Sequence, residues 1–136
     1  MGWLCDDLGD YLTSGGVTTT RYTEFLPEQP DEALLLKESG GMGPVHAMAS
    51  GPGQAVEEAA GLQVIRRSRT YRRARVEMGV IFRLLDGFGD RVLNGTRYSW
   101  IEAVQSPFPL GRDESDRSLV ACNFLVYKAL TTSTST

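Results

Sequence analysis

Residues 62–88 read LQVIRRSRTYRRARVEMGVIFRLLDGF, and this stretch decides the fold. Its first part, Leu62 to Thr70, opens with alternating aliphatic and β-branched residues and predicts a strand. Its second part predicts a helix from Tyr71 to about Asp86, with Thr70 as N-cap and Gly87 as the stop. Apolar side chains recur there at helical spacing, at Tyr71, Ala74, Met78, Ile81, Phe82 and Leu85. A strand that runs straight into an amphipathic helix predicts helices packed on a sheet.

The flanking sequence predicts one more helix and several more strands. Residues 2–14 have apolar side chains at helical spacing, and Asp6, Asp7 and Asp10 occupy the opposite, polar face. Extended segments are expected at residues 18–25, 33–38, 97–105 and 118–128. We therefore predict an α+β domain over residues 1–130, with one mixed, mostly antiparallel sheet of about four to five strands and two helices packed on one face.

The segment between the strands at 33–38 and 62–70 is unusually rich in glycine and proline. Seven such residues lie within the fourteen positions from Gly40 to Gly53, and we expect them to break any regular element. A connection of this length in a compact domain is typical of a functional arm or a disordered segment. We predict an extended arm at about 39–61, ordered on assembly, and a disordered Thr/Ser tail at 131–136.

Composition limits the possible classes of protein. A net charge of −3 over 136 residues excludes a globally basic nucleic-acid binder, although a local basic patch remains possible. The sequence contains no signal-peptide pattern and no apolar run long enough to cross a bilayer, so we expect no membrane association. Cys5 and Cys122 are interpreted as ordinary small apolar residues, and Asn94-Gly95-Thr96 as a turn.

The sequence gives little support for catalysis. His46 is the single histidine, and it lies in the glycine-rich segment with no partner indicated by the sequence. The adjacent acidic pairs do not face each other on a helix and are usually solvated in loops. Neither a nucleophile elbow nor a zinc-binding pattern is present. We predict that the chain is not an enzyme, with no catalytic residues, no cofactor and no metal.

The sharpest local feature is a run of arginines. Half of the twelve arginines lie within ten residues, at Arg66, Arg67, Arg69, Arg72, Arg73 and Arg75. The run crosses from a strand into a helix, so its side chains cannot share one face. Three interpretations remain open: a solvated surface, direct contact with nucleic-acid phosphates, or pairing with carboxylates of another subunit. We favour subunit pairing, because arginine is preferred at interfaces and acidic clusters are available.

A second polar segment, Ser106 to Arg117, joins the last two predicted strands. It contains two prolines and the sequence Gly111-Arg112-Asp113-Glu114. Asp113 can bond its own backbone two residues on, which would hold Arg112 and Glu114 outward. We predict a structured contact loop in which Arg112 or Asp113 pairs with another chain or a neighbouring strand. The alternative is a solvent-facing hairpin end.

Four features then stand in order along the chain. They are LCDDLGDYLTSGGV at 4–17, LPEQPDEALLLKESGG at 26–41, the 62–88 stretch, and IEAVQSPFPLGRDESDRSLVACNFLVYK at 101–128. This ordered set, over roughly residues 4–128, resembles the tail terminator family of long-tailed bacteriophages, often labelled minor capsid protein. The length and glycine content of residues 39–61 depart from the family pattern.

The resemblance implies a structural virion protein of the tail and neck, assembled in the host cytoplasm. Such proteins form a hexameric ring that caps the head-proximal end of the tail tube, ends tube polymerisation and meets the head connector or stopper protein. DNA would only pass through the lumen. The family's conspicuous positions map onto turn-shaping and contact residues here, at Pro107, Gly111, Arg112, Asp113, Arg117 and Asn123.

Together, the residues and the resemblance predict a set of subunit-interface residues. They are Arg66, Arg67, Arg69, Arg72, Arg73, Arg75, Arg112, Asp113, Glu114 and Arg117. Two other functions remain open. One is a different neck or head–tail joining protein, which copy number and stacking position would distinguish. The other is a small basic-patch nucleic-acid-binding module, which steep loss of DNA binding with salt would favour.

Overall fold

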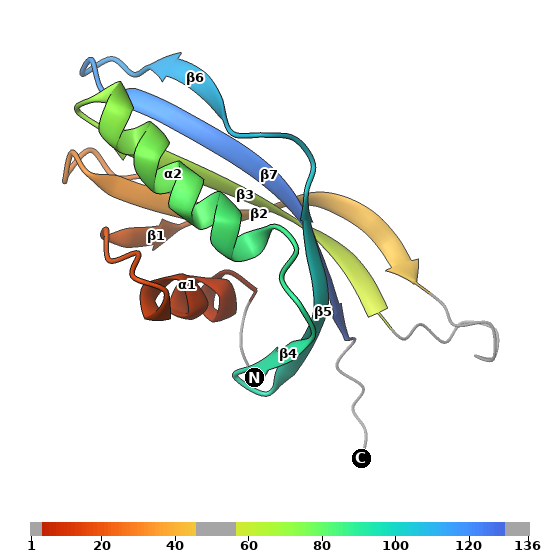
Figure 1. The fold of residues 1–136 in the computed structure, drawn as a ribbon. Coiled ribbons are helices and arrows are strands. Elements are labelled where there is room, and N and C mark those ends of the chain that lie inside the picture. The colour runs from red at the N-terminus through yellow and green to blue at the C-terminus, as the bar shows by residue number, and fades with distance from the viewer. Residues whose placement is uncertain (1–3, 46–56, 130–136) are drawn as a thin grey trace.

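The computed structural model describes residues 4–45 and 57–129, which form one mixed sheet and two helices (Figure 1). The predicted α+β class, with both helices on one face of a mostly antiparallel sheet, is confirmed. The described residues contain seven strands, more than the four to five predicted. The elements are α1 (Leu4–Ser14), β1 (Arg21–Thr23), β2 (Ala33–Val45), β3 (Glu57–Ser68), α2 (Tyr71–Leu85), β4 (Arg91–Leu93), β5 (Thr96–Ala103), β6 (Phe108–Arg112) and β7 (Ser118–Ala129).

The strands are ordered β1-β2-β3-β7-β5-β4, and β6 also pairs with β7. Among the strands of the described residues, only β1 and β2 run parallel to each other, and the other pairs are antiparallel. One edge of β7 is fully paired with β3, whereas its other edge is shared between β6 and β5. The last strand in chain order is therefore central to the sheet.

The core lies between the sheet and α2. Val64 on β3 and Phe124 on β7 alternate with outward residues, whereas Met78 and Ile81 recur at helical spacing, and all four side chains are buried. Burying side chains of this size contributes roughly 1.5–3 kcal/mol each. The capping predictions for α2 are also confirmed. The Thr70 side chain accepts a hydrogen bond from the Arg73 amide at 3.3 Å, and Gly87 has a φ of 79° just beyond the helix.

The glycine-rich segment is more regular than its sequence predicts. β2 continues through Gly40 to Val45, so the expectation that these residues break regular structure was wrong for Gly40, Gly41, Gly43 and Pro44, and β3 already begins at Glu57. Register shifts between Ser39 and Pro44 absorb the irregular residues, as bulges do at sheet edges. The connecting residues 46–56 and the tail at 130–136 lie outside the described ranges, so the arm and tail remain predictions.

The polar segment after β5 also contains a strand that was not predicted. Residues 108–112 form β6, which pairs with the first residues of β7. The interpretation of Asn94-Gly95 as a turn is confirmed, because both residues have positive φ, at 50° and 85°, between β4 and β5. Short edge strands such as β4 and β6 contain too few apolar residues to show a recognisable alternating pattern in the sequence.

Asp7 is the main correction to the predicted helix faces. Its side chain is buried, although the sequence placed it on the polar face of α1. The carboxylate accepts hydrogen bonds from the Tyr98 hydroxyl and, at 2.8 Å, from the Asn94 side-chain amide. Burial raises the pKa of Tyr98 well above its usual range, and the Asp7 carboxylate adds to this shift. The hydroxyl therefore remains a hydrogen-bond donor at neutral pH, and links β5 to α1.

Candidate functional site

The arginine run divides where β3 gives way to α2. Arg66 and Arg67 lie at the end of β3, and each is only 3% exposed. The remaining four arginines lie in the connection or on the first turns of α2, and all are exposed. Adjacent strand residues point to opposite faces, and contacts with the segment at 30–32 cover both Arg66 and Arg67, whereas the start of the helix turns its side chains toward solvent.

Arg66 joins three parts of the chain. Its guanidinium pairs with Glu77 on α2 and, at 3.0 Å, with Glu32 before β2. It also donates to the backbone carbonyl of Arg67. Glu77 in turn accepts a hydrogen bond from the Thr19 hydroxyl at 2.6 Å. A buried cation with two carboxylate partners is satisfied within the subunit.

Arg67 points to the opposite face and binds backbone. Its side chain donates to the carbonyl oxygens of Pro30 at 2.5 Å and Asp31 at 3.3 Å. Burial lowers the pKa of Arg67, and the nearby positive charge of Arg117 lowers it further. The group stays charged at any physiological pH, because an arginine pKa begins far above neutrality.

Arg117, directly before β7, is the third buried arginine, with 2% of its area exposed. It pairs with Asp113 at 2.9 Å, and with Glu28 and Asp31 at 3.3 Å each. Asp113 also accepts from the amides of Ser115 at 3.0 Å and Arg117 at 2.9 Å. Partial burial acts to raise the pKa of Asp113, but these hydrogen bonds outweigh it and hold that pKa below its ordinary value. The predicted bond from Asp113 to the backbone two residues on is therefore present.

Glu32 gathers the remaining contacts. Its carboxylate accepts from the Ser68 hydroxyl and the Arg69 amide at 3.1 Å each, and it lies 3.6 Å from the Arg73 guanidinium. Partial burial acts to raise its pKa, but the hydrogen bonds from Arg69, Ser68 and Arg66 outweigh that effect and lower it. Glu32 is thus held as a carboxylate at the junction of β3 and α2.

These contacts form one connected network, which we call the arginine clasp. It comprises Arg66, Arg67, Arg117, Glu28, Asp31, Glu32, Glu77 and Asp113. The clasp fixes the segment before β2 against the ends of β3 and β7. Three of the predicted interface arginines are therefore buried in contacts within their own chain, and their role between subunits stays a prediction.

The exposed members of the predicted set have weaker contacts. Arg69 lies 3.6 Å from Asp31, and Arg75 donates to the Pro107 carbonyl at 2.8 Å. Arg112 pairs with Asp116 at 3.0 Å within its own turn. Exposed pairs of this kind contribute little to stability, about 0–1 kcal/mol. Glu114 is exposed as well, and Arg72 has no ion-pair partner in the part of the chain that the structure describes.

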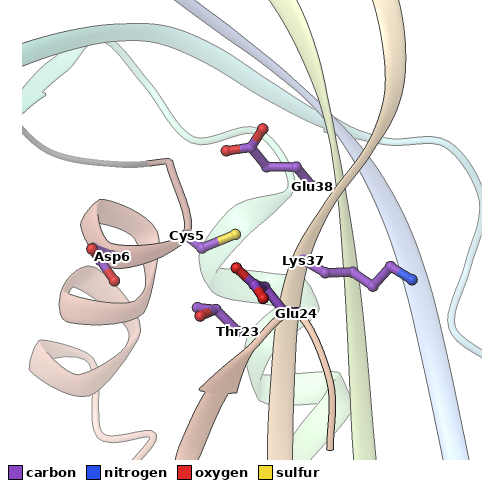
Figure 2. Close-up of a pocket in the computed structure, with 6 residues that line it drawn as sticks. All are labelled: Cys5, Asp6, Thr23, Glu24, Lys37 and Glu38. Carbon is purple, nitrogen blue, oxygen red and sulfur yellow. The ribbon is translucent and has the colours of Figure 1, made fainter.

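A pocket of about 590 Å³ lies at the junction of α1, β1 and β2 (Figure 2). It is lined by Cys5, Asp6, Thr23, Glu24, Lys37 and Glu38. Burial raises the pKa of the Cys5 thiol to about 11, and the negative charges of Glu38 and Asp6 add to the shift. A thiol that remains protonated is a poor nucleophile. Within residues 4–45 and 57–129, no cluster of three His, Cys, Asp or Glu side chains is arranged to hold a metal.

One feature of the site was not predicted from the sequence, the set of carboxylates that pairs with the buried arginines. The carboxylates at Glu28, Asp31 and Glu32 precede a buried strand, and their proximity to the arginines depends on the pairing of β2 with β3. The one sequence signal that could have indicated this proximity was the opposite charge of the arginine run and of the segment that carries these carboxylates. His46 lies outside the described residues. None of the helices described is long and apolar enough to cross a membrane.

Comparison with known proteins identifies the family. The model of the bacteriophage tail terminator protein family matches residues 8–128, which confirms the resemblance seen in the sequence. No curated protein matches the chain. A similar solved structure comes from the virion of a native gene transfer agent particle, with a TM-score of 0.62 and 16% sequence identity. The match covers 93% of this chain and 95% of that chain, so the two share a fold over nearly their whole lengths.

Proposed function

The chain belongs to the bacteriophage tail terminator protein family and is thus a structural protein of a phage tail; from this premise we propose that it forms a hexameric ring. The ring caps the head-proximal end of the tail tube and ends tube polymerisation. Its other side meets the head connector or stopper protein, and DNA passes through the lumen. The observation that carries the proposal is the family match over residues 8–128.

The charge distribution supports a role in assembly. The sequence is net acidic, yet α2 presents several exposed arginines to solvent. Head-to-tail contacts between unlike surfaces close into rings, and unlike charge on different faces of one subunit suits such contacts. On this proposal the protein is located in the neck of the virion after assembly in the host cytoplasm, and it has no catalytic role.

The mass of the purified full-length chain tests the ring. Sedimentation equilibrium of the free protein should give six times the subunit mass of 14.9 kDa. Electron microscopy of particles should then place the protein between tube and head. A stable copy number other than six, or a position elsewhere in the neck, would favour a different head–tail joining protein.

The exposed arginines of α2 also allow a second candidate, a nucleic-acid-binding module. It predicts a monomer that retains duplex DNA and loses it steeply as salt rises. Measuring DNA retention at several salt concentrations alongside the mass separates the two functions, because a ring subunit needs no affinity for free DNA.

A further inference from the structure

The outward face of α2 carries an unusual combination of side chains. Arg72, Val76, Gly79 and Arg83 recur at helical spacing and form one line along the helix, which we call the outer ridge. They lie opposite the buried face of Ala74, Met78, Ile81 and Leu85. Both arginines are exposed, and Val76 is 62% exposed. The ridge spans about 16 Å between its two arginines, at a rise of 1.5 Å per residue.

The outer ridge has no negative charge to balance it. The one acidic residue of α2, Glu77, faces inward and pairs with Arg66. Neither Arg72 nor Arg83 has an ion-pair partner among residues 4–45 and 57–129. An exposed valine between two such arginines, with no aromatic residue on the ridge for base stacking, suits a protein partner better than a nucleic acid.

The pocket of Figure 2 has the opposite charge. Asp6 on α1, Glu24 after β1 and Glu38 on β2 surround it, and Lys37 extends to the other side of β2. Each of the three carboxylates is exposed, and none has an ion-pair partner within the described ranges. We call this surface the acidic groove.

An apolar side chain also lies next to the acidic groove. Phe25 follows Glu24 directly and is 68% exposed. Glu24 has a φ of 78°, a conformation that costs a non-glycine residue energy and is retained where the surrounding structure or a function requires it. The turn therefore holds a carboxylate and an exposed aromatic ring side by side at the free edge of the sheet.

We propose that the outer ridge of one copy docks into the acidic groove of a second copy. Arg72 and Arg83 pair with the groove carboxylates, and Val76 contacts Phe25. The two surfaces lie on different elements of the subunit, so the contact is head-to-tail and leaves a free ridge at one end of a chain of subunits and a free groove at the other. The inference rests on the proposed ring and identifies the surfaces that build it.

Charge reversal tests the contact. A ridge variant, R72E/R83E, places two acids against the acidic groove, whereas a groove variant, E24K/E38K, places two bases against the ridge. Each variant alone should weaken self-association at least tenfold, because like charges then face each other. An equimolar mixture should assemble again, because every ridge then meets a groove of opposite charge. Sedimentation measures all three, and circular dichroism checks that each variant is folded.

Control variants separate the specific contact from net charge. V104E/L110E adds negative charge at two exposed residues, one after β5 and one on β6, that belong to neither surface, and it should leave assembly unchanged. The single variant E38K replaces E24K/E38K if the strained turn at Glu24 does not tolerate substitution, and it should weaken assembly in the same direction.

The outcomes distinguish the contact from the ring itself. A wild-type oligomer that neither charge-reversal variant weakens would refute the docking and leave the ring intact. A wild-type chain that stays monomeric at every concentration, with and without tail tubes, would contradict both. If R72E/R83E keeps the wild-type mass but loses retention of duplex DNA, the ridge is a nucleic-acid surface and the docking is wrong.

Discussion

Arg66 and Arg72 are six residues apart, and their side chains have opposite environments. Arg66 is buried between two carboxylates, whereas Arg72 extends into solvent on the outer face of α2. A strand that ends at Ser68 and a helix that begins at Tyr71 are enough to separate them. The arginines of this run therefore have two roles. The buried ones stabilise the fold, and the exposed ones place positive charge on the surface.

The first prediction concerns this division. Arg66→Ala leaves Glu77 and Glu32 without their main partner, and we expect a loss of about 3 kcal/mol in the free energy of unfolding. Both carboxylates are partly exposed, which keeps the loss at the lower end for a broken buried pair. Arg72→Ala, the matched control, should change stability by less than about 0.5 kcal/mol. Urea denaturation measures both, and equal losses would contradict the arginine clasp.

The second prediction concerns the stability of the fold at acidic pH. The lowered pKa of Glu32 means that its contribution to stability is complete above its unfolded value of about 4.5 and is lost as the pH falls through the folded value. The pKa of Asp113, lowered from 3.8, acts in the same direction. We expect the thermal midpoint to fall between about pH 5 and pH 3.

Glu32→Gln provides the control for this pH dependence. The amide cannot titrate, so the variant should be less stable at pH 7 and should lose less stability on acidification than the wild type. Differential scanning calorimetry across the pH range makes the comparison. Parallel pH profiles for the two proteins would show that Glu32 is not responsible.

The third prediction concerns the buried carboxylate of Asp7. Tyr98→Phe removes its hydroxyl donor and leaves the side-chain amide of Asn94 as its remaining side-chain donor among the described residues. We expect a loss of about 1–3 kcal/mol, the desolvation cost of an under-satisfied buried acceptor. Tyr127→Phe removes a half-buried hydroxyl on the other face of the sheet and should cost little. A Tyr98→Phe variant as stable as the wild type would refute the role of this bond.

At the scale of elements, the long pairing of β2 with β3 depends on one close approach. A Cβ atom on Gly61 would lie 2.3 Å from the carbonyl oxygen of Gly40, whereas a Cβ on Gly40 would meet nothing within 4 Å. Gly61→Ala must therefore push the two strands apart, and we expect a loss of about 1–3 kcal/mol. Gly40→Ala should be neutral or slightly stabilising. Denaturation of the two variants, one on each side of the same contact, provides the test.

Elements with strong local signals were predictable from the sequence. α2 has a cap, a stop and an apolar stripe, and β7 alternates over its length, so both were predicted close to their observed bounds. β6 and the outer half of β2 were not, because their glycines and prolines are tolerated by pairing with a neighbour that the sequence does not reveal. Asp7 was misplaced for a related reason: its donor, Tyr98, lies 91 residues away.

The candidate site was predictable in composition but not in arrangement. The arginine run and the turn at Asp113 were recognisable as sequence features. Which arginines are buried depends on the segment at 28–32, and long-range strand pairing brings that segment to them. Local sequence gives no measure of such pairing.

At the scale of the whole molecule, the proposed contact is electrostatic and exposed, unlike the clasp. Raising the salt concentration to about 1 M shortens the Debye length to about 3 Å and screens exposed pairs far more than buried ones. We expect the oligomer to dissociate while far-ultraviolet circular dichroism and thermal stability remain close to their low-salt values. Sedimentation at low and high salt measures the mass. An oligomer insensitive to salt would indicate an apolar interface elsewhere on the subunit.

The central place of β7 has a consequence for synthesis on the ribosome. β7 is the last element of the fold in chain order, yet β3 pairs along its whole length with β7, and β5 and β6 occupy the opposite edge. Until residues 118–129 emerge from the ribosome, the groups β1-β2-β3 and β4-β5 are not joined to each other, β6 has no partner strand, and their edges are open. Folding must therefore finish after translation of this strand, with slow, long-range pairing as its final step. A chain that lacks this strand cannot form the complete sheet of the subunit.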